Sequence, residues 1–281
     1  MDDASWLRLT GFIAIFAIMA ALEIFWPARK SPLSRWLRWR PNLLMVVLGA
    51  LTARVLLPAT LLGVALMAEE RGWGLFHYVS WPLWLEIVLS VLWLDLFIYW
   101  QHRLFHRIPW LWRIHKMHHA DSHIDVTTGL RFHPAEIAIS LLVKALAIFI
   151  AGAPAVAVVI FEIALNGFSL FNHTNIRLPQ HIDDVLGCFI ITQRLHRIHH
   201  SQYKSETDTN FGFSVSWWDR LFKSFKSRAA QSDEKLEVGQ KAYPPTKKNN
   251  SVLRLLTLPL DSPTAVNPKP EDDNATGDFR K

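Results

Sequence analysis

The chain has 281 residues, 51% of them apolar, and a formal net charge of +6. Its one cysteine, Cys188, excludes an intramolecular disulfide and any zinc or iron–sulfur site built from cysteines. The basic residues are spread between apolar segments and no nucleic-acid-binding motif is present, so the positive charge does not indicate a nucleic-acid partner.

Four apolar segments are long enough for the hydrocarbon core of a membrane, which requires roughly 20 apolar residues. Residues 9–26 come first; their flank is acidic and no small-residue cleavage site follows, which favours a retained span over a signal peptide. Residues 43–67 and 82–100 are the second and third predicted spans. Residues 136–171 are too long for one helix, and Gly-Ala-Pro at 152–154 predicts a hairpin of two helices.

The charges of two loops predict how these spans are oriented. Residues 28–41 contain only basic charges, whereas residues 69–81 contain two glutamates and one arginine. The positive-inside rule therefore places residues 28–41 in the cytoplasm. The third span then ends inside and the hairpin begins and ends inside. We expect a multi-pass protein of the bacterial inner membrane or the endoplasmic reticulum, with its histidine clusters on the cytoplasmic face.

The composition divides the chain into a membrane domain and a polar tail. Beyond the hairpin the long apolar runs stop, and residues 174–226 are expected to form a cytosolic helical cap. Polar residues and proline dominate 227–281, which predicts a mostly disordered tail with an apolar patch at 252–260 that docks on the cap or the lipid surface. The predicted fold is an all-α integral membrane bundle of about four or five transmembrane or re-entrant helices over residues 1–226, with a histidine core at 95–200.

Histidine clusters are the most informative motifs of the sequence. The pattern His-x-x-His-His occurs twice, and a pair spaced four residues apart precedes the first copy. Positions i, i+3 and i+4 share one face of a helix, so each triplet directs three imidazoles to one point. Imidazole is the commonest side-chain metal ligand, and eight are too many for one ion, which predicts a two-metal centre. The eight predicted ligands are His102, His106, His115, His118, His119, His196, His199 and His200.

Asp95 lies seven and eleven residues before His102 and His106, on nearly the same helical face. We expect this helix to continue to about Arg107 and to stop near Pro109, because the residue before a proline is pushed out of the helical region. A carboxylate at this position could accept the outer N–H of a ligand imidazole and fix its tautomer. The alternative is that Asp95 bonds to a neighbouring helix.

A similar face is predicted in the hairpin, where Glu162, Asn166 and His173 lie at spacings of four and seven residues. We predict His173 as a ninth metal ligand, with Glu162 and Asn166 forming a polar stripe beneath it. The alternative for His173 is an interfacial histidine bonded to backbone. His133, in RFHPAE, lies near the predicted site in sequence, but it could simply cap the next helix.

The segments HRLFH, HKMHH, NHTN and HRIHH, followed by NFGFSVSWWDRLF, resemble the fatty acid hydroxylase and sterol desaturase superfamily over roughly residues 85–225. The resemblance implies an integral membrane di-iron oxidase that uses O2. By position, it implies iron ligation by the eight clustered histidines and His173. The NHTN segment departs from some relatives, because it offers Asn172 and Asn175 where they have a second histidine. One iron could then be completed by water or by an amide.

The resemblance also supplies the expected reaction. Imidazole suits Fe, Cu, Zn or Ni, so iron is implied by the family and not by ligand type. The sequence has no Walker loop, dinucleotide fingerprint or haem-attachment cysteines, so electrons must come from a separate donor of the cytochrome b5, ferredoxin or reductase type. We expect hydroxylation or desaturation of an unactivated C–H bond of a lipid (sterol, fatty acyl or related). No catalytic residue is expected beyond the metal centre.

Two other functions could also explain these histidine clusters. A zinc-dependent membrane hydrolase would need a carboxylate as general base, but the triplets carry Lys, Met, Arg and Ile between their histidines. A metal transporter or sensor is a non-enzymatic alternative. Transporters place their ion sites near the membrane midplane, whereas these histidines are predicted to gather at one face.

Overall fold

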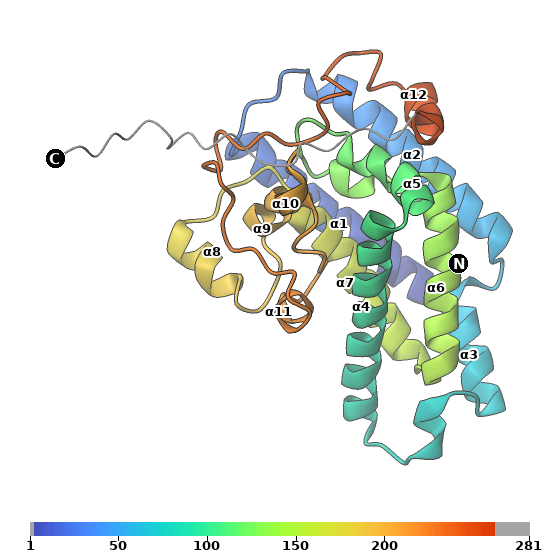
Figure 1. Ribbon diagram of the computed structural model, residues 1–281. Helices are drawn as coiled ribbons and strands as arrows, with labels where there is room; N and C mark the ends of the chain where they lie inside the picture. The colour runs from blue at the N-terminus through green and yellow to red at the C-terminus, as the bar shows by residue number, and fades with distance from the viewer. Residues whose placement is uncertain (1–2, 262–281) are drawn as a thin grey trace.

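The computed structural model describes residues 3–261, and within them every regular element is a helix, which confirms the predicted all-α class. The long helices pack side by side, and short helices and loops of the cap cover one end of the bundle and part of its side (Figure 1). The helices are α1 Asp3–Phe25, α2 Arg35–Leu56, α3 Thr60–Arg71, η1 Leu75–Tyr78, α4 Leu83–Arg107, α5 Pro109–His119, η2 Thr128–Leu130, α6 Pro134–Ala151, α7 Ala155–His173, α8 Gln180–Leu186, α9 Gln193–His199, α10 Lys204–Thr207, α11 Trp217–Leu221, α12 Val252–Thr257 and η3 Leu258–Leu260.

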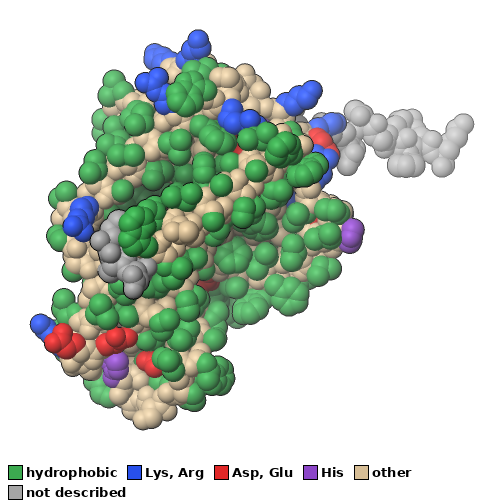
Figure 2. Space-filling view, turned by 180° about the vertical axis from the view of Figure 1, so that it is seen from behind, with side chains coloured by type: hydrophobic (Ala, Val, Ile, Leu, Met, Phe, Trp, Pro, Cys, Tyr) green, Lys and Arg blue, Asp and Glu red, His purple; other side chains and the backbone are tan. Residues whose placement is uncertain are grey.

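Five segments of the described chain are long and apolar enough to cross a membrane: Trp6–Phe25, Arg35–Tyr78, Leu83–Arg107, Pro134–Ala151 and Ala155–His173. Many of their large apolar side chains are exposed, as expected of helices that face lipid. Figure 2 shows hydrophobic side chains over most of one face of the molecule. Lys and Arg side chains gather at the top of that view, and Asp and Glu lie chiefly near the bottom.

Proline and glycine set the ends of these helices as the sequence predicted. The helix α4 ends at Arg107, directly before the Ile108–Pro109 step. The helix α6 ends at Ala151 and is followed by Gly152, whose left-handed backbone (φ 70°) suits a residue without a side chain. The helix α7 then starts after Pro154, which confirms the predicted hairpin.

The second predicted span, residues 43–67, is not one helix. It is divided between α2 and α3 at Leu57, whose φ of −133° and ψ of 78° lie outside the helical region. The residue that follows is Pro58, which clashes with a helical conformation at the residue before it. The prediction missed this break because the apolar composition continues across the proline.

The structure places residues 227–261 of the predicted tail against the bundle. Leu255 and Leu258 are buried against Met45 of α2 and Met117 of α5. This segment has too few apolar residues for a core of its own, but they fill gaps in the surface of the bundle. The apolar patch at 252–260 docks on helices, while residues 262–281 of the predicted tail lie outside the described residues.

A buried polar cluster joins α2 to the loop after α5. The guanidinium of Arg38 donates to Asp121 at 2.7 Å and to Asp125 at 2.7 and 2.9 Å. Thr128 donates its hydroxyl to Asp121 at 2.8 Å. Buried charges of this kind are stable only when they are paired, so the cluster fixes the loop that follows the HKMHH triplet.

Candidate metal centre

Nine histidine side chains meet where α4, α5, α7 and α9 converge. They form two groups, and within each group one ligand atom per residue lies within 4.8 Å of all the others. The first group is His102, His106, His115, His119 and His199. The second group is His118, His173, His196 and His200. The structure thus brings together the eight clustered histidines and the predicted ninth, His173.

In the first group the Nε2 atoms point inward. The Nε2 atoms of His106 and His119 are 3.1 Å apart. Those of His102, His115 and His199 are buried and have no hydrogen-bond partner in the protein. These three rings bond outward through Nδ1 instead, at 2.7 Å in each case, to the Phe211 carbonyl, Glu136 and the Thr209 carbonyl respectively.

The second group has the same inward arrangement. The Nε2 atom of His173 is 3.1 Å from that of His118 and 3.0 Å from that of His196. The Nε2 atoms of His196 and His200 are 3.2 Å apart. The Nδ1 atom of His173 donates to the Ser169 carbonyl at 2.7 Å, which leaves the Nε2 lone pair directed into the group.

This geometry fits metal ions better than hydrogen bonds between rings. Nitrogens bound at about 2 Å to a shared ion are about 3 Å from one another. An outer carbonyl or carboxylate that takes the Nδ1 proton is the usual partner of a metal-binding histidine. Burial lowers the pKa of His118, His119, His196 and His200 well below the usual value, and that of His199 to about 3. These imidazoles are therefore neutral at neutral pH, as metal ligands must be.

The predicted role of Asp95 is corrected by the structure. Its carboxylate accepts hydrogen bonds from Ser214 and, at 2.6 Å, from the indole N–H of Trp218. The outer nitrogen of His102 bonds to a backbone carbonyl instead, so the partner predicted from helical spacing is wrong. Asp95 ties the cap to α4, which is close to the alternative role of bonding to a neighbouring element.

The predicted polar stripe beneath His173 does not form. Glu162 pairs with Arg8 of α1 at 2.6 Å, and Asn166 is exposed, with its amide donating to the Glu162 carbonyl at 2.8 Å. The partner of His173 is the Ser169 carbonyl, one helical turn away. A residue seven or eleven positions before a histidine lies two or three turns below it, beyond the reach of its ring.

The remaining predicted neighbours are two asparagines and one histidine. The amide nitrogen of Asn172 donates to the Phe213 carbonyl at 2.6 Å, and that of Asn175 donates to the Arg29 carbonyl at 2.8 Å. The Asn172 Oδ1 atom is buried and has no hydrogen-bond partner in the protein. His133 caps α6 by accepting from the Ala135 N–H at 3.1 Å. The capping role is therefore the observed one of its two predicted roles.

Sequence reasoning missed two carboxylates that touch the histidine groups. Glu136 accepts from His115 Nδ1 at 2.7 Å, and Asp208 lies 3.5 Å from His106 Nδ1. Glu136 stands in RFHPAE, three residues after His133, so the residue of this motif that contacts the site is the glutamate and not the predicted histidine. No spacing rule links Asp208 to His106, because they are on separate elements.

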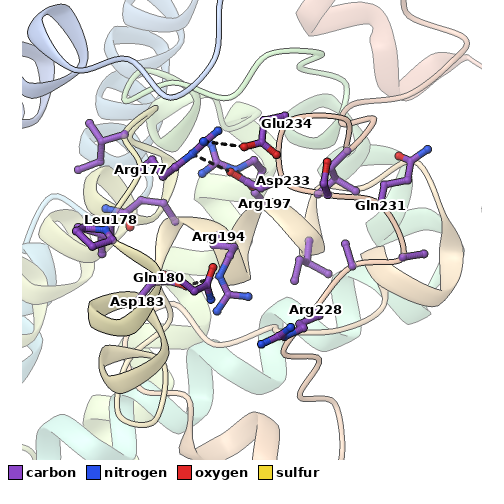
Figure 3. A pocket seen from close by; sticks show the side chains of 18 residues that line it. Arg177, Leu178, Gln180, Asp183, Arg194, Arg197, Arg228, Gln231, Asp233 and Glu234 are labelled. Atoms are coloured by element: carbon purple, nitrogen blue, oxygen red, sulfur yellow. Dashed lines mark hydrogen bonds and ion pairs between the residues drawn. The ribbon is translucent and has the colours of Figure 1, made fainter.

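A polar pocket of about 550 Å³ lies on the outer side of α9 (Figure 3). Seven charged residues line it: Arg177, Arg194, Arg197, Arg228, Asp183, Asp233 and Glu234. Arg197 pairs with Asp233 at 2.8 Å and Arg177 with Glu234 at 2.7 Å. The pair between Arg197 and Asp233 attaches the segment around Asp233 to α9, the helix that carries His196 and His199.

A helical membrane bundle with two buried histidine groups defines a class of membrane protein suited to binding two metal ions. Within this class, residues 87–224 match the family described as Fatty acid hydroxylase. All nine histidines of the two groups lie in this range. This match confirms the resemblance to the fatty acid hydroxylase family that the histidine clusters predicted.

Several curated proteins are similar to the chain. Ornithine lipid hydroxylase OlsE of Rhizobium tropici is 31% identical over 147 residues, which cover 52% of this chain and 43% of the relative. Alkylglycerol monooxygenase of Danio rerio is 28% identical over 180 residues, covering 61% and 37%. Lathosterol oxidase of Homo sapiens is 31% identical over 178 residues, covering 60% and 56%. The chain thus spans less than two thirds of each of these relatives, and no solved structure matches it.

Proposed function

We propose that this protein is a membrane-bound di-iron oxygenase that hydroxylates or desaturates an unactivated C–H bond of a lipid. It would use O2 and electrons from a separate donor. The observation that carries the proposal is the convergence of nine buried imidazoles in two groups within a fatty acid hydroxylase domain. Imidazole alone admits several metals, and iron follows from the iron dependence of the family.

One iron ion is assigned to each group of histidines. When bound, the ions supply the activation of O2 and the removal of hydrogen from the substrate. The chain holds the rings in place, because the outer partners of His102, His115, His173 and His199 fix where each Nδ1 proton lies. The indole of Trp112 packs 4.9 Å from the His106 ring and helps to exclude water from the first group.

A lipid is the substrate class that fits best. The three relatives named above act, by their names, on an ornithine lipid, an alkylglycerol and a sterol. All three names describe the oxidation of a lipid, but the three lipids have no head group or ring system in common. Because α4 and α7 carry ligands at their ends and are apolar enough to span a membrane, the centre would lie near a substrate that stays in the bilayer.

The histidine groups are assigned to the cytoplasmic face. The loop between α1 and α2 contains only basic charges, and Lys and Arg gather at one end of the molecule in Figure 2. The positive-inside rule places that end in the cytoplasm. A soluble or membrane-bound electron donor would then approach the cap from the cytoplasm.

Metal content tests the proposal directly. The purified full-length chain is expected to bind about two irons, and His118→Ala and His199→Ala should each lower the iron content, because they remove ligands from different groups. Both variants should lose O2-dependent oxidation of a lipid extract supplied with a reductant. His181→Ala is the matched control, since His181 is exposed and belongs to neither group.

If the purified protein contains zinc, a second assay is needed, because overexpression can load zinc into such sites. The zinc-loaded protein is therefore stripped, reconstituted with ferrous iron and assayed for O2 consumption. Two zincs with no O2 consumption and no oxidised lipid after reconstitution would contradict the oxygenase and favour the hydrolase or transporter alternatives.

A further inference from the structure

The cap exposes an apolar surface that the five candidate spans do not include. It consists of Ile182, Val185 and Phe189 around α8, together with Trp217 and Leu221 of α11; we refer to it as the cap face. Each of these side chains is between 41% and 64% exposed. The spacings of three residues between Ile182 and Val185 and of four between Trp217 and Leu221 place each pair along one side of its short helix, and Phe189 follows in the turn after α8. So many large apolar groups in one contiguous area indicate an interaction surface.

The two parts of the cap face are held together by backbone contacts. The Ser216 N–H donates to the Phe189 carbonyl at 3.0 Å, and the Ile191 N–H donates to the Ser214 carbonyl at 2.8 Å. Arg220 of α11 donates from its guanidinium to the Gly187 carbonyl at 3.0 Å. The cap face is therefore a single preformed surface.

The level of α11 along α4 decides what this surface meets. Trp218 bonds to Asp95, which lies twelve residues before the end of α4 at Arg107 and therefore about 18 Å below it. Phe222 packs on Trp100 with ring centroids 4.8 Å apart. In Figure 1, α11 accordingly lies beside α4 and not beyond its end. The cap thus descends along the side of a candidate membrane span.

Trp100 and Leu104, on the outer surface of α4, are 39% and 44% exposed, so the apolar surface of the span continues onto the cap. The charges near the cap face suit a lipid head-group region. Lys223 is exposed next to α11, and the exposed carboxylate of Asp184 is paired with Arg194 at 3.0 Å. An apolar face with basic residues at its edge is typical of segments that lie in a membrane interface.

We propose that the cap face is inserted into the leaflet of the membrane that adjoins the metal centre. Its occupant is the lipid of that leaflet, because the surface is continuous with α4 and lies well below the end of that helix. The cap would then be anchored from the side as well as by its chain connections. The proposal rests on α4 spanning the membrane and does not require the proposed oxidation.

Cys188 provides a probe at this surface. It is exposed, it lies between Val185 and Phe189, and it is the one cysteine of the 281-residue chain. The full-length protein is labelled there with a nitroxide and reconstituted in vesicles of phosphatidylcholine and phosphatidylglycerol. Power-saturation EPR then compares collisions with O2, which concentrates in lipid, and with a nickel chelate, which stays in water. We expect the ratio of O2 to nickel accessibility to be several-fold higher than for a label in water.

The matched control places the label on the distant side of the cap. In Cys188→Ser/Lys247→Cys, the label is on an exposed residue of the segment before α12, and it should collide freely with nickel. High nickel accessibility at position 188 would overturn the proposal, because the cap face would then lie in water. Low accessibility to both reagents would also overturn it, since the surface would be covered by a second copy or by another protein.

A second pair of variants tests the surface without moving the probe. Val185→Ser and Phe189→Ser remove exposed side chains, so they should leave folding in detergent unchanged. Each should lower the O2-to-nickel ratio at Cys188, and unchanged ratios would contradict insertion. Iron content is measured on the same samples, so a failure of insertion is distinguished from a failure of the proposed metal centre.

Discussion

The contact between His115 and Glu136 connects the first histidine group to α6. Glu136 is buried and accepts the His115 Nδ1 proton at 2.7 Å. Glu136→Ala would leave that proton without a buried partner and the ring free to turn. Removal of such an outer partner typically costs about 10–100-fold in metal affinity. We expect a loss of that size in chelator-competition titrations, and a smaller one for Glu136→Gln, whose amide oxygen still accepts.

Glu162→Gln is the control for this prediction. Glu162 was predicted from its spacing to lie beneath a metal ligand, but it pairs with Arg8. Metal affinity in this variant should equal that of the unmodified chain. If Glu162→Gln weakened metal binding as strongly as Glu136→Ala, the arrangement of outer partners described here would be wrong.

The buried imidazole of His123 makes stability depend on pH. Burial and, secondarily, Arg38 lower the pKa of His123 from its usual 6.5 to about 4. Folding favours the neutral form of His123. Its contribution to the free energy of unfolding is therefore fully present above about pH 6.5 and is lost as the pH falls towards 4. It amounts to no more than about 3 kcal/mol, since each pKa unit corresponds to about 1.4 kcal/mol. Thermal unfolding of the iron-loaded protein in detergent should follow this pH range.

His123→Gln isolates this contribution from that of other groups. A glutamine does not titrate, so the fall in the unfolding temperature between about pH 6.5 and pH 4 should be shallower than in the unmodified chain. Parallel curves for the two proteins would show that His123 is not buried in its neutral form.

At the scale of elements, Arg38 determines how α2 meets the loop after α5. Arg38→Met would leave Asp121 and Asp125 buried without their cation. Breaking a buried ion pair in this way costs about 3–5 kcal/mol. We expect a large fall in the unfolding temperature in detergent. Arg35→Met, an exposed arginine one turn earlier on α2, should change it little, and equal effects would contradict a structural role for the cluster.

The element boundaries could be predicted where the signal is local. Pro109 marked the end of α4, and Gly152 with Pro154 marked the hairpin, because each acts on the backbone of its nearest neighbours. The break of the second span at Pro58 is the same kind of signal, but a long apolar stretch obscured it. The polar cluster could not be predicted, since Arg38 and Asp121 are separated by 83 residues.

The same distinction between local signals and long-range contacts explains which parts of the site could be predicted. The two triplets, the upstream pair and the predicted ninth ligand His173 together account for all nine histidines that converge. Residues three or four positions apart share one helical face, so the triplets and the pair are local signals. Their outer partners were predicted from spacing on the same helix, and this failed for Asp95 and Glu162. Only His173 bonds outward within its own helix, to Ser169, whereas Glu136 and the carbonyl of Phe211 come from other elements.

At the scale of the whole molecule, residues 227–261 connect the cap back to the membrane helices. Leu255 is fully buried against Met45 and Met117, and Met117 lies between His115 and His118. Asp261 closes the segment, accepting from Tyr243 at 2.8 Å and pairing with Arg254. The segment therefore stabilises the outer side of α5, the helix that carries one histidine triplet.

Leu255→Ala tests whether this attachment is a stable part of the fold. Truncation of a buried leucine costs about 2–5 kcal/mol, and here the cost falls on the docking of α12. Residues 241–248 contain exposed lysines, so limited trypsin digestion should cut there much faster in the variant. Leu253→Ala is the control on the same helix, because Leu253 is 74% exposed and its loss should leave the cleavage rate unchanged. Equal rates in both variants would mean that α12 is released as readily when Leu255 is present, so the docking observed here would contribute no stability to the triplet helix.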